Sequence, residues 1–220
     1  MKETKSNYCE YCGEFHDFVH DHLSLVKVGE PVPDFQFETY HEDKVKAMSF
    51  SALRGKWVAL VFYPADFTFV CPTELEELAA LYPEFKKAGA EIVSMSTDTV
   101  FVHKAWHAAS EGIAKIAYPM GADPSGKIAS AFGVLVEGED EAALTPDEGL
   151  ALRGTFIIDP SGILRAMEVN DTSIGRNGAE TLRKLRAVQF VDAHKGKVCP
   201  ASWEPGDDPL EPGLNLVGKL

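Results

Sequence analysis

The stretch that decides the fold reads Trp57-Val58-Ala59-Leu60-Val61-Phe62-Tyr63, then Pro64-Ala65-Asp66-Phe67-Thr68-Phe69-Val70-Cys71-Pro72, then Thr73-Glu74-Leu75-Glu76-Glu77-Leu78-Ala79-Ala80-Leu81-Tyr82. Its first part is continuously apolar and rich in β-forming residues, which is typical of a strand covered on both faces. Its last part repeats apolar side chains at helical spacing. We therefore predict a central strand over 57–63, a loop, and a helix over 73–82.

The segments that follow continue the alternation of strand and helix. The pattern predicts a strand over 91–96 and a helix over 100–109, and repeated βα units favour a parallel core. Two apolar runs within 155–169 flank the turn Pro160-Ser161-Gly162, which indicates a hairpin and hence a mixed sheet. A helix is predicted over 179–194. This order fits an α/β fold of thioredoxin-like layout, with a mixed central sheet flanked by helices, although periodicity alone leaves other mixed α/β folds open.

The ends of the chain differ in composition from its middle. We predict an appendage over 1–28, one domain over 29–195 and a C-terminal tail over 196–220. From Pro200 onward the tail carries four prolines and three glycines, so it is expected to be extended and mobile.

Composition and charge exclude several classes of function. The formal net charge of −13 disfavours nucleic acids and anionic membranes, which require clusters of lysine and arginine. No apolar run approaches the roughly 20 residues of a membrane span, and the first residues lack the apolar core of a secretory signal. We therefore expect a cytoplasmic protein. Four cysteines are too few for a disulfide-stapled scaffold, which leaves the sulfurs as candidates for chemistry.

The tripeptide Val-Cys-Pro occurs twice, around Cys71 and around Cys199, and the repetition suggests a redox pair. Pro72 favours a helix start, which places Cys71 near the N-cap, where unpaired N–H groups stabilise an anion. Glu74 is positioned to fold back as in a capping box and to orient a cation. The alternative is an inert cysteine that merely packs at the start of a helix.

Several motifs resemble those of the peroxiredoxins. The loop from Phe62 to Glu74 resembles the peroxidatic-cysteine motif of that family, and the segment from Gly196 to Trp203 resembles the resolving-cysteine segment of its typical two-cysteine subgroup. Further matches are His103-Lys104-Ala105-Trp106-His107, Arg153-Gly154-Thr155-Phe156-Ile157-Ile158-Asp159 and Leu216-Val217-Gly218-Lys219-Leu220. Together they are similar to the bacterial alkyl hydroperoxide reductase C type, from about residue 28 to the C-terminus.

The resemblance implies a role for each matching residue. Cys71 would attack a hydroperoxide and become a sulfenic acid. Arg153 would stabilise the thiolate and bind peroxide oxygen, with its strand antiparallel to the 57–63 strand. Thr68 would hydrogen-bond the peroxide, and Pro64 would shield the sulfur from water. Arg176 matches a second arginine that helps to hold the site, although an exposed loop position is nearly as consistent with the sequence.

Partners are implied in the same way. Cys199 of a second subunit would form a disulfide with Cys71, which requires a homodimer, commonly assembled as five dimers in a ring. Thioredoxin or a flavoprotein disulfide reductase would then reduce the disulfide. No metal or organic cofactor is implied.

Two stretches depart from peroxiredoxins that over-oxidise easily. Those proteins carry a Gly-Gly-Leu-Gly loop and a Tyr-Phe tail helix, whereas this chain has Glu111-Gly112-Ile113-Ala114-Lys115-Ile116 and Leu216-Val217-Gly218-Lys219-Leu220. We predict that Cys71 resists conversion to sulfinic acid.

Histidines and cysteines elsewhere offer weaker candidates. Cys9, Cys12, His16 and His20 have the ligand types of a zinc site, but the pairs lie too close together for a zinc finger. They could instead form an auxiliary dithiol or a plain appendage. His103 and His107 share an i, i+4 spacing, which we interpret as a pair on a helix surface.

Two rival functions remain open at the level of sequence. A redox-regulated holdase or ring-forming structural protein would use the cysteines only for assembly. A thioredoxin-like disulfide oxidoreductase would place both sulfurs in one Cys-x-x-Cys at the helix start, and no second cysteine follows Cys71 there.

Overall fold

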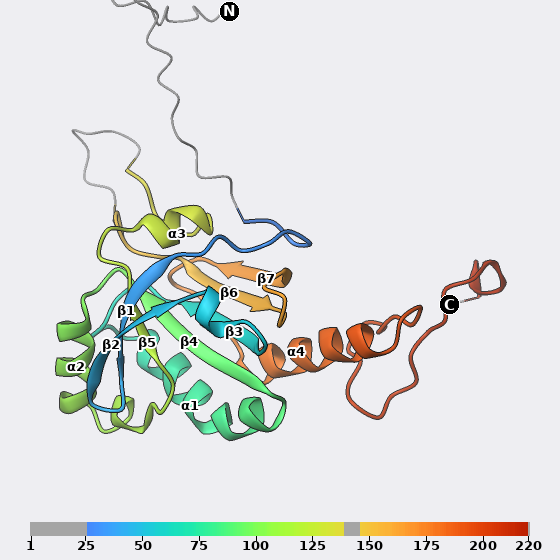
Figure 1. The fold of residues 1–220 in the computed structure, drawn as a ribbon, viewed down its shortest axis with the longest axis horizontal. Helices are drawn as coiled ribbons and strands as arrows, with labels where there is room; N and C mark the ends of the chain where they lie inside the picture. Colours follow the sequence, from blue (N-terminus) through green and yellow to red (C-terminus); the bar gives the residue numbers. More distant parts are fainter. Residues whose placement is uncertain (1–25, 139–145, 220) are drawn as a thin grey trace, which may run out of the picture.

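A single seven-stranded sheet forms the centre of the protein in a computed structural model, which describes residues 26–138 and 146–219. The strand order is β2-β1-β5-β4-β3-β6-β7 (Figure 1). The strands are β1 (Gln36–His41), β2 (Lys44–Ser49), β3 (Trp57–Phe62), β4 (Ala90–Ser96), β5 (Met120–Ala122), β6 (Arg153–Ile158) and β7 (Leu164–Asn170).

The sheet is mixed, as the sequence predicts. Strand β3 pairs in parallel with β4 and antiparallel with β6, and β6 pairs antiparallel with β7 across the predicted hairpin. Strands β4 and β5 are also parallel. The predicted parallel core and the predicted antiparallel relation between the 57–63 strand and the strand of Arg153 are both confirmed.

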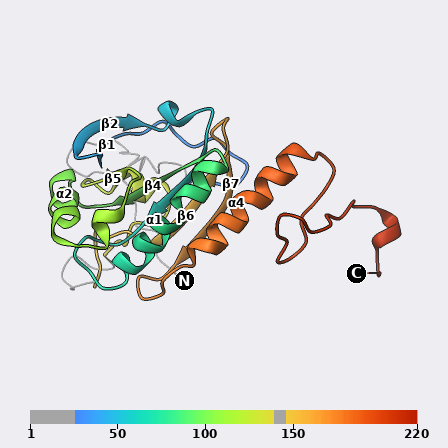
Figure 2. The same cartoon turned by 90° about the horizontal axis from the view of Figure 1, so that it is seen from below.

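Helices cover both faces of this sheet. The helices are α1 (Cys71–Lys87), α2 (Val100–Ala109), α3 (Lys127–Ala131) and α4 (Gly178–Ala193). On one face, α3 contributes Ile128 and Ala129 to a core that also contains Phe62 and Phe156. On the other face, α1 and α4 lie side by side (Figures 1 and 2), and Leu75 and Leu185 join a second core.

Alternating side chains of β3 pack into the two cores. Leu60 and Phe62 point into the α3 side, whereas Ala59 and Val61 point into the side of α1 and α4. This explains why the sequence of β3 is continuously apolar, and it fixes the strand end from which the Cys71 loop departs.

The C-terminal segment only partly matches the prediction of an extended tail. After α4 the chain leaves the body of the domain (Figures 1 and 2), but Val198 and Leu210 exchange two backbone hydrogen bonds of 2.9 Å. Trp203 is buried, with 3% of its surface exposed, and its ring lies against that of Phe190 on α4. The first half of the tail is therefore a closed loop packed on α4, which corrects the expectation of an extended segment.

Among the described residues, no helix is long and apolar enough to cross a membrane.

Candidate active site

Cys71 is the first residue of α1 and is completely buried, with 0% of its surface exposed. Val70 is the N-cap residue and makes no side-chain capping bond. The predicted capping box is therefore wrong, because the carboxylate of Glu74 turns away from the helix start toward two arginines. At the helix start Pro72 has no N–H group, and the N–H groups of Thr73 and Glu74 donate to the backbone oxygen of Val70 at 3.1 and 3.3 Å. The charge beside the sulfur therefore comes from Arg153 rather than from free backbone donors.

Arg153 connects the start of β6 to this sulfur. Its Nη1 atom donates to the Sγ of Cys71 at 3.5 Å and to Oε2 of Glu74 at 2.7 Å. Its Nε atom donates to the backbone oxygen of Thr172 at 2.8 Å. Only 3% of the arginine side chain is exposed, so a permanently charged group is held against the sulfur away from bulk water.

Glu74 is the anchor that both arginines share. Its Oε1 accepts hydrogen bonds from the backbone N–H and Nε of Arg176, at 2.7 and 2.8 Å, and its Oε2 accepts a bond from Nη2 at 3.0 Å. Burial alone would raise the pKa of Glu74, but the hydrogen bonds and charge of Arg176, together with the charge of Arg153, outweigh burial and lower it. The carboxylate is therefore ionised when it holds the two guanidinium groups.

Arg176 is more deeply integrated than an exposed loop residue would be. Its side chain is 5% exposed and also donates from Nη1 to the backbone oxygen of Gly154 at 2.7 Å. The alternative of an exposed position is therefore wrong. Arg176 ties the loop before α4 to both α1 and β6.

The loop between β3 and α1 holds two further predicted residues. Pro64 is buried directly after β3, and the hydroxyl of Thr68 donates to the backbone oxygen of Ala65 at 2.9 Å. This bond orients the lone pairs of the Thr68 hydroxyl away from Ala65, so they remain able to accept a hydrogen bond. Phe67 adopts a φ of +55° and places its ring 6.0 Å from that of Trp106, which fixes the bend of the loop.

A buried network that the sequence analysis missed supports the same loop. Asp66 accepts from the hydroxyl of Tyr63 at 2.7 Å and contacts Nδ1 of His103 at 2.8 Å, while Nε2 of His103 contacts the backbone oxygen of Gly121 at 3.0 Å. His103 is 0% exposed, so its interpretation as a surface residue is wrong. His107 is partly buried and contacts the backbone oxygen of Ile116. Asp66 lies in the loop between β3 and α1, and His103 lies in a motif that resembles the family. These two positions were the signals in the sequence that could have revealed the network.

Cys199 occupies a different environment, at the start of the closed loop after α4. It is partly exposed, and its Sγ lies 3.7 Å from the backbone oxygen of Ala187 on α4. Burial raises the pKa of its thiol, and the charge of Arg183 opposes this effect in part. Cys71 and Cys199 are both free thiols in this structure.

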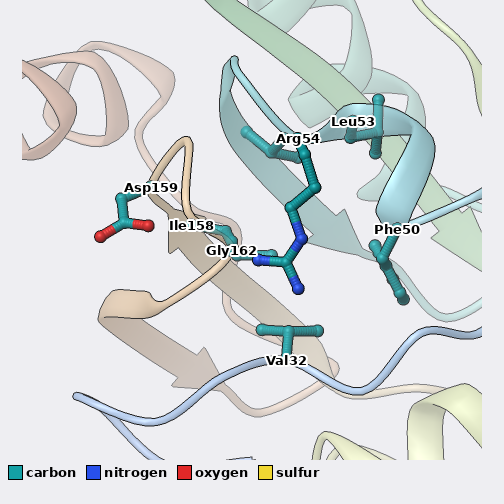
Figure 3. A pocket seen from close by; sticks show the side chains of 8 residues that line it. Val32, Phe50, Leu53, Arg54, Ile158, Asp159 and Gly162 are labelled. Carbon is teal, nitrogen blue, oxygen red and sulfur yellow. The ribbon is translucent and has the colours of Figure 1, made fainter.

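A small pocket lies away from these residues, between the β6–β7 turn and the segment before β3 (Figure 3). The guanidinium of Arg54 crosses above Gly162 and donates to the backbone oxygen of Ser161. The pocket has room for about one water molecule. It is too small to accept an organic substrate.

The candidates at the N-terminus, Cys9, Cys12, His16 and His20, lie outside the described residues. Within residues 26–138 and 146–219, no group of three or more histidine, cysteine or acidic side chains is arranged to hold a metal ion.

Comparisons with known proteins agree with this geometry. A family model described as the AhpC/TSA family matches residues 28–167, which include Cys71 and Arg153. The chain belongs to the AhpC/TSA family of peroxiredoxins. A second model, described as the C-terminal domain of 1-Cys peroxiredoxin, matches residues 187–213 of this peroxiredoxin, a segment that contains Cys199.

Relatives and solved structures extend the match over most of the chain. Alkyl hydroperoxide reductase C of Pseudomonas aeruginosa is 44% identical over 90% of this chain and all of its own length. The protein of that name from Salmonella typhimurium is 51% identical, covering 76% of this chain and 84% of its own.

Among solved structures, the crystal structure of Enterococcus faecalis AhpC aligns with a TM-score of 0.73 at 44% identity, over 80% of this chain and all of that one. The reduced 2-Cys peroxiredoxin of Plasmodium vivax aligns with a TM-score of 0.75 at 31% identity, over 84% of this chain and 93% of that one. This peroxiredoxin therefore has the thioredoxin-like fold that the sequence predicts, and it is a thiol-dependent peroxidase.

Proposed function

We propose that this peroxiredoxin reduces hydrogen peroxide and alkyl hydroperoxides through Cys71, and that Cys199 of a partner subunit resolves the oxidised form. The observation that carries the proposal is the contact of 3.5 Å between Nη1 of Arg153 and the sulfur of Cys71. A thiolate is the nucleophilic form of cysteine, and a buried guanidinium is the group that stabilises it best at this position.

In the first step, the Cys71 thiolate attacks the terminal oxygen of the hydroperoxide. A sulfur–oxygen bond forms, the O–O bond breaks, and the sulfur loses two electrons to become a sulfenic acid. The departing oxygen takes up a proton and leaves as water or an alcohol. Arg153 and the hydroxyl of Thr68 hydrogen-bond the peroxide oxygens as charge develops on them, and Pro64 keeps bulk water from the sulfur.

In the second step, the Cys199 thiol attacks the sulfenic sulfur, so that a disulfide forms and water leaves. A dithiol reductase, either thioredoxin or a flavoprotein disulfide reductase, then returns both sulfurs to thiols by exchange and becomes oxidised itself. Glu74 and Arg176 contribute by position, because they hold Arg153 in place.

A homodimer, assembled as five dimers, is part of the proposal. It is supported by the C-terminal end of α4 and the segment after it, which project from the domain instead of folding back over the sheet (Figure 1). Exposed aromatic rings beside the active-site loop also favour an interface there, because Phe69 is 93% and Phe101 is 74% exposed.

The test uses a Cys9→Ser/Cys12→Ser background, so that Cys71 and Cys199 are the only sulfurs able to pair. Peroxide consumption is measured with dithiothreitol, and disulfides are resolved on a non-reducing gel after one equivalent of peroxide. We expect Cys71→Ser to abolish consumption and either single variant to abolish the dimer band.

Mixed subunits test the exchange between chains. Combining Cys71→Ser with Cys199→Ser protein should restore a cross-linked dimer that contains one disulfide. If Cys71→Ser consumes peroxide as fast as the parent, the proposed chemistry is wrong. A disulfide that forms only within single chains would instead contradict the partner-subunit assignment.

A further inference from the structure

The Cys199 loop, residues 198–210, is closed on itself. Its two ends are joined by the backbone hydrogen bonds between Val198 and Leu210. Inside it, the indole N–H of Trp203 donates to the backbone oxygen of Asp207 at 3.1 Å. The ring of Trp203 lies 4.8 Å from that of Phe190 on α4. The loop is therefore a compact unit that docks on one face of α4.

Arg183 on α4 makes the polar contact that holds this loop. Its Nη1 atom donates to the backbone oxygen of Trp203 at 2.8 Å. Two further N–H groups bond Glu180, with Nε donating to Oε2 at 2.6 Å and Nη2 to Oε1 at 2.8 Å. Glu180 is fixed in turn, because its backbone N–H donates to the side-chain oxygen of the N-cap residue Asn177. Glu180 therefore fixes the orientation in which the guanidinium of Arg183 contacts the loop.

Cys199 docks one helical turn further along the same face. Ala187, whose backbone oxygen faces the Sγ, follows Arg183 at the i+4 position. A carbonyl oxygen accepts the S–H proton but repels a thiolate. Burial in this place also raises the pKa of the thiol. While the loop is docked, Cys199 is therefore held as a protonated thiol.

Cys199 must leave its position on α4 before a disulfide with Cys71 can form. The two sulfurs of a disulfide lie about 2.05 Å apart, so Cys199 cannot bond to Cys71 while it remains on Ala187. We propose that Arg183 is a positioning residue for the resolving step, and that its bond to Trp203 keeps Cys199 docked and unreactive until the loop is released. The inference rests on the proposed function of Cys199 as the resolving cysteine.

The docking itself is tested by alkylation of the reduced protein. In a Cys71→Ser background, the modification of Cys199 by iodoacetamide is followed by mass spectrometry of its peptide. We expect Arg183→Met to react about fivefold faster than the parent, the factor for loss of a partly exposed charge-assisted hydrogen bond. Arg183→Lys should fall between the two, because an ammonium cannot reproduce the fork that joins Glu180 to Trp203.

Arg186→Met is the matched control. It removes the same side chain one turn along α4, but Arg186 contacts Glu84 of α1 and not the loop. Its alkylation rate should equal that of the parent. A rate for Arg183→Met that is indistinguishable from that of Arg186→Met would overturn the proposal. Should Arg183→Met fail to fold, Glu180→Gln loosens the same contact with Arg183 in place, and an unchanged alkylation rate there would overturn it equally.

A kinetic measurement separates this inference from the proposed function. In protein with both cysteines, Arg183→Met should form the Cys71–Cys199 disulfide a few-fold faster after peroxide, with Cys71 oxidised at the parent rate. Slower disulfide formation would contradict a restraining contact. If the parent forms no such disulfide, the proposed function fails, while the alkylation rates still decide whether Arg183 holds the loop.

Discussion

Cys71 and Cys199 share the tripeptide Val-Cys-Pro but lie in opposite kinds of surroundings. Cys71 is completely buried at the start of α1, with two buried arginines and Glu74 around it. Cys199 lies on a loop outside the sheet domain, partly exposed, with a backbone oxygen as its nearest polar neighbour. The difference teaches that the same three residues carry no reactivity of their own, because reactivity depends on the charges that the fold places beside the sulfur.

The most direct test of this difference between the two cysteines is to remove the charge beside Cys71. Arg153→Met keeps an unbranched apolar stem but deletes the guanidinium at 3.5 Å from the sulfur. We expect the second-order rate of Cys71 oxidation by peroxide to fall about 100- to 1000-fold, as when one preorganised donor is lost from an active site. Stopped-flow measurement of the reduced enzyme with peroxide gives this rate.

Arg165→Met is the control for that substitution. Arg165 pairs with Asp159 and Asp192, is 28% exposed, and belongs to β7 rather than to the site. In Arg165→Met, the rate of Cys71 oxidation should equal that of the parent protein. An Arg153→Met enzyme that reacts as fast as Arg165→Met would show that the Cys71 environment is no more activating than that of Cys199.

The anchor of the Cys71 site gives the next largest effect. Glu74→Gln leaves two buried guanidinium groups without their carboxylate, so the free energy of unfolding should fall by about 3 kcal/mol. Urea denaturation measures it. Glu84→Gln, which disturbs only the ion pairs of a 40% exposed carboxylate, should leave stability almost unchanged. Equal effects of the two changes would mean that the buried cluster contributes little.

The lowered pKa of Glu74 adds a dependence on pH. A folded-state pKa below the ordinary value of 4.5 gives stability that is fully present above that value and is lost as the pH falls through the lowered pKa. The stability difference between the parent and Glu74→Gln should therefore be constant from pH 7 to about pH 5 and shrink in more acidic solution. Unfolding curves at several pH values measure it, and a difference that grows on acidification would reverse the sign of this argument.

The smallest expected effect concerns over-oxidation. Residues 111–116 form the short 3-10 helix η2 (Ile113–Lys115), and Leu214 in the short 3-10 helix η3 (Leu214–Leu216) is 93% exposed, so the C-terminal segment does not cover the domain as a tail helix would. We expect disulfide to dominate over sulfinic acid at Cys71 after repeated turnover with micromolar peroxide. Mass spectrometry of the Cys71 peptide distinguishes the two products, and mostly sulfinic Cys71 would contradict the prediction.

The sequence predicted the interior of this protein better than its edges. Strand β3 and helix α2 were recognised because continuous apolar runs and helical periodicity are strong local signals. Strands β1 and β2 were missed because each has only six residues with few strongly apolar side chains, and because β2 is largely exposed. Strand β5 has only three residues and depends on its neighbours for its hydrogen bonds.

The site shows the same division between local and distant causes. Cys71, Arg153 and Glu74 were found because each lies in a recognisable motif. The burial of His103 could not be read from its helix, because its partners Asp66 and Gly121 come from other parts of the chain. The proline and glycine content of the tail predicts an extended segment that includes Trp203. Composition does not reveal that this single aromatic ring packs on α4.

The shared anchor at Glu74 has a consequence for the oxidised enzyme. Two guanidinium groups and one carboxylate leave the buried cluster with an excess of one positive charge. A thiolate at Cys71 neutralises that excess, whereas a sulfenic acid, being uncharged, does not. Oxidation therefore converts a balanced interior into one with an uncompensated charge, and water is the nearest medium that can solvate it. After the chemical step, the unbalanced charge at the buried start of α1 thus favours access of solvent to the oxidised sulfur.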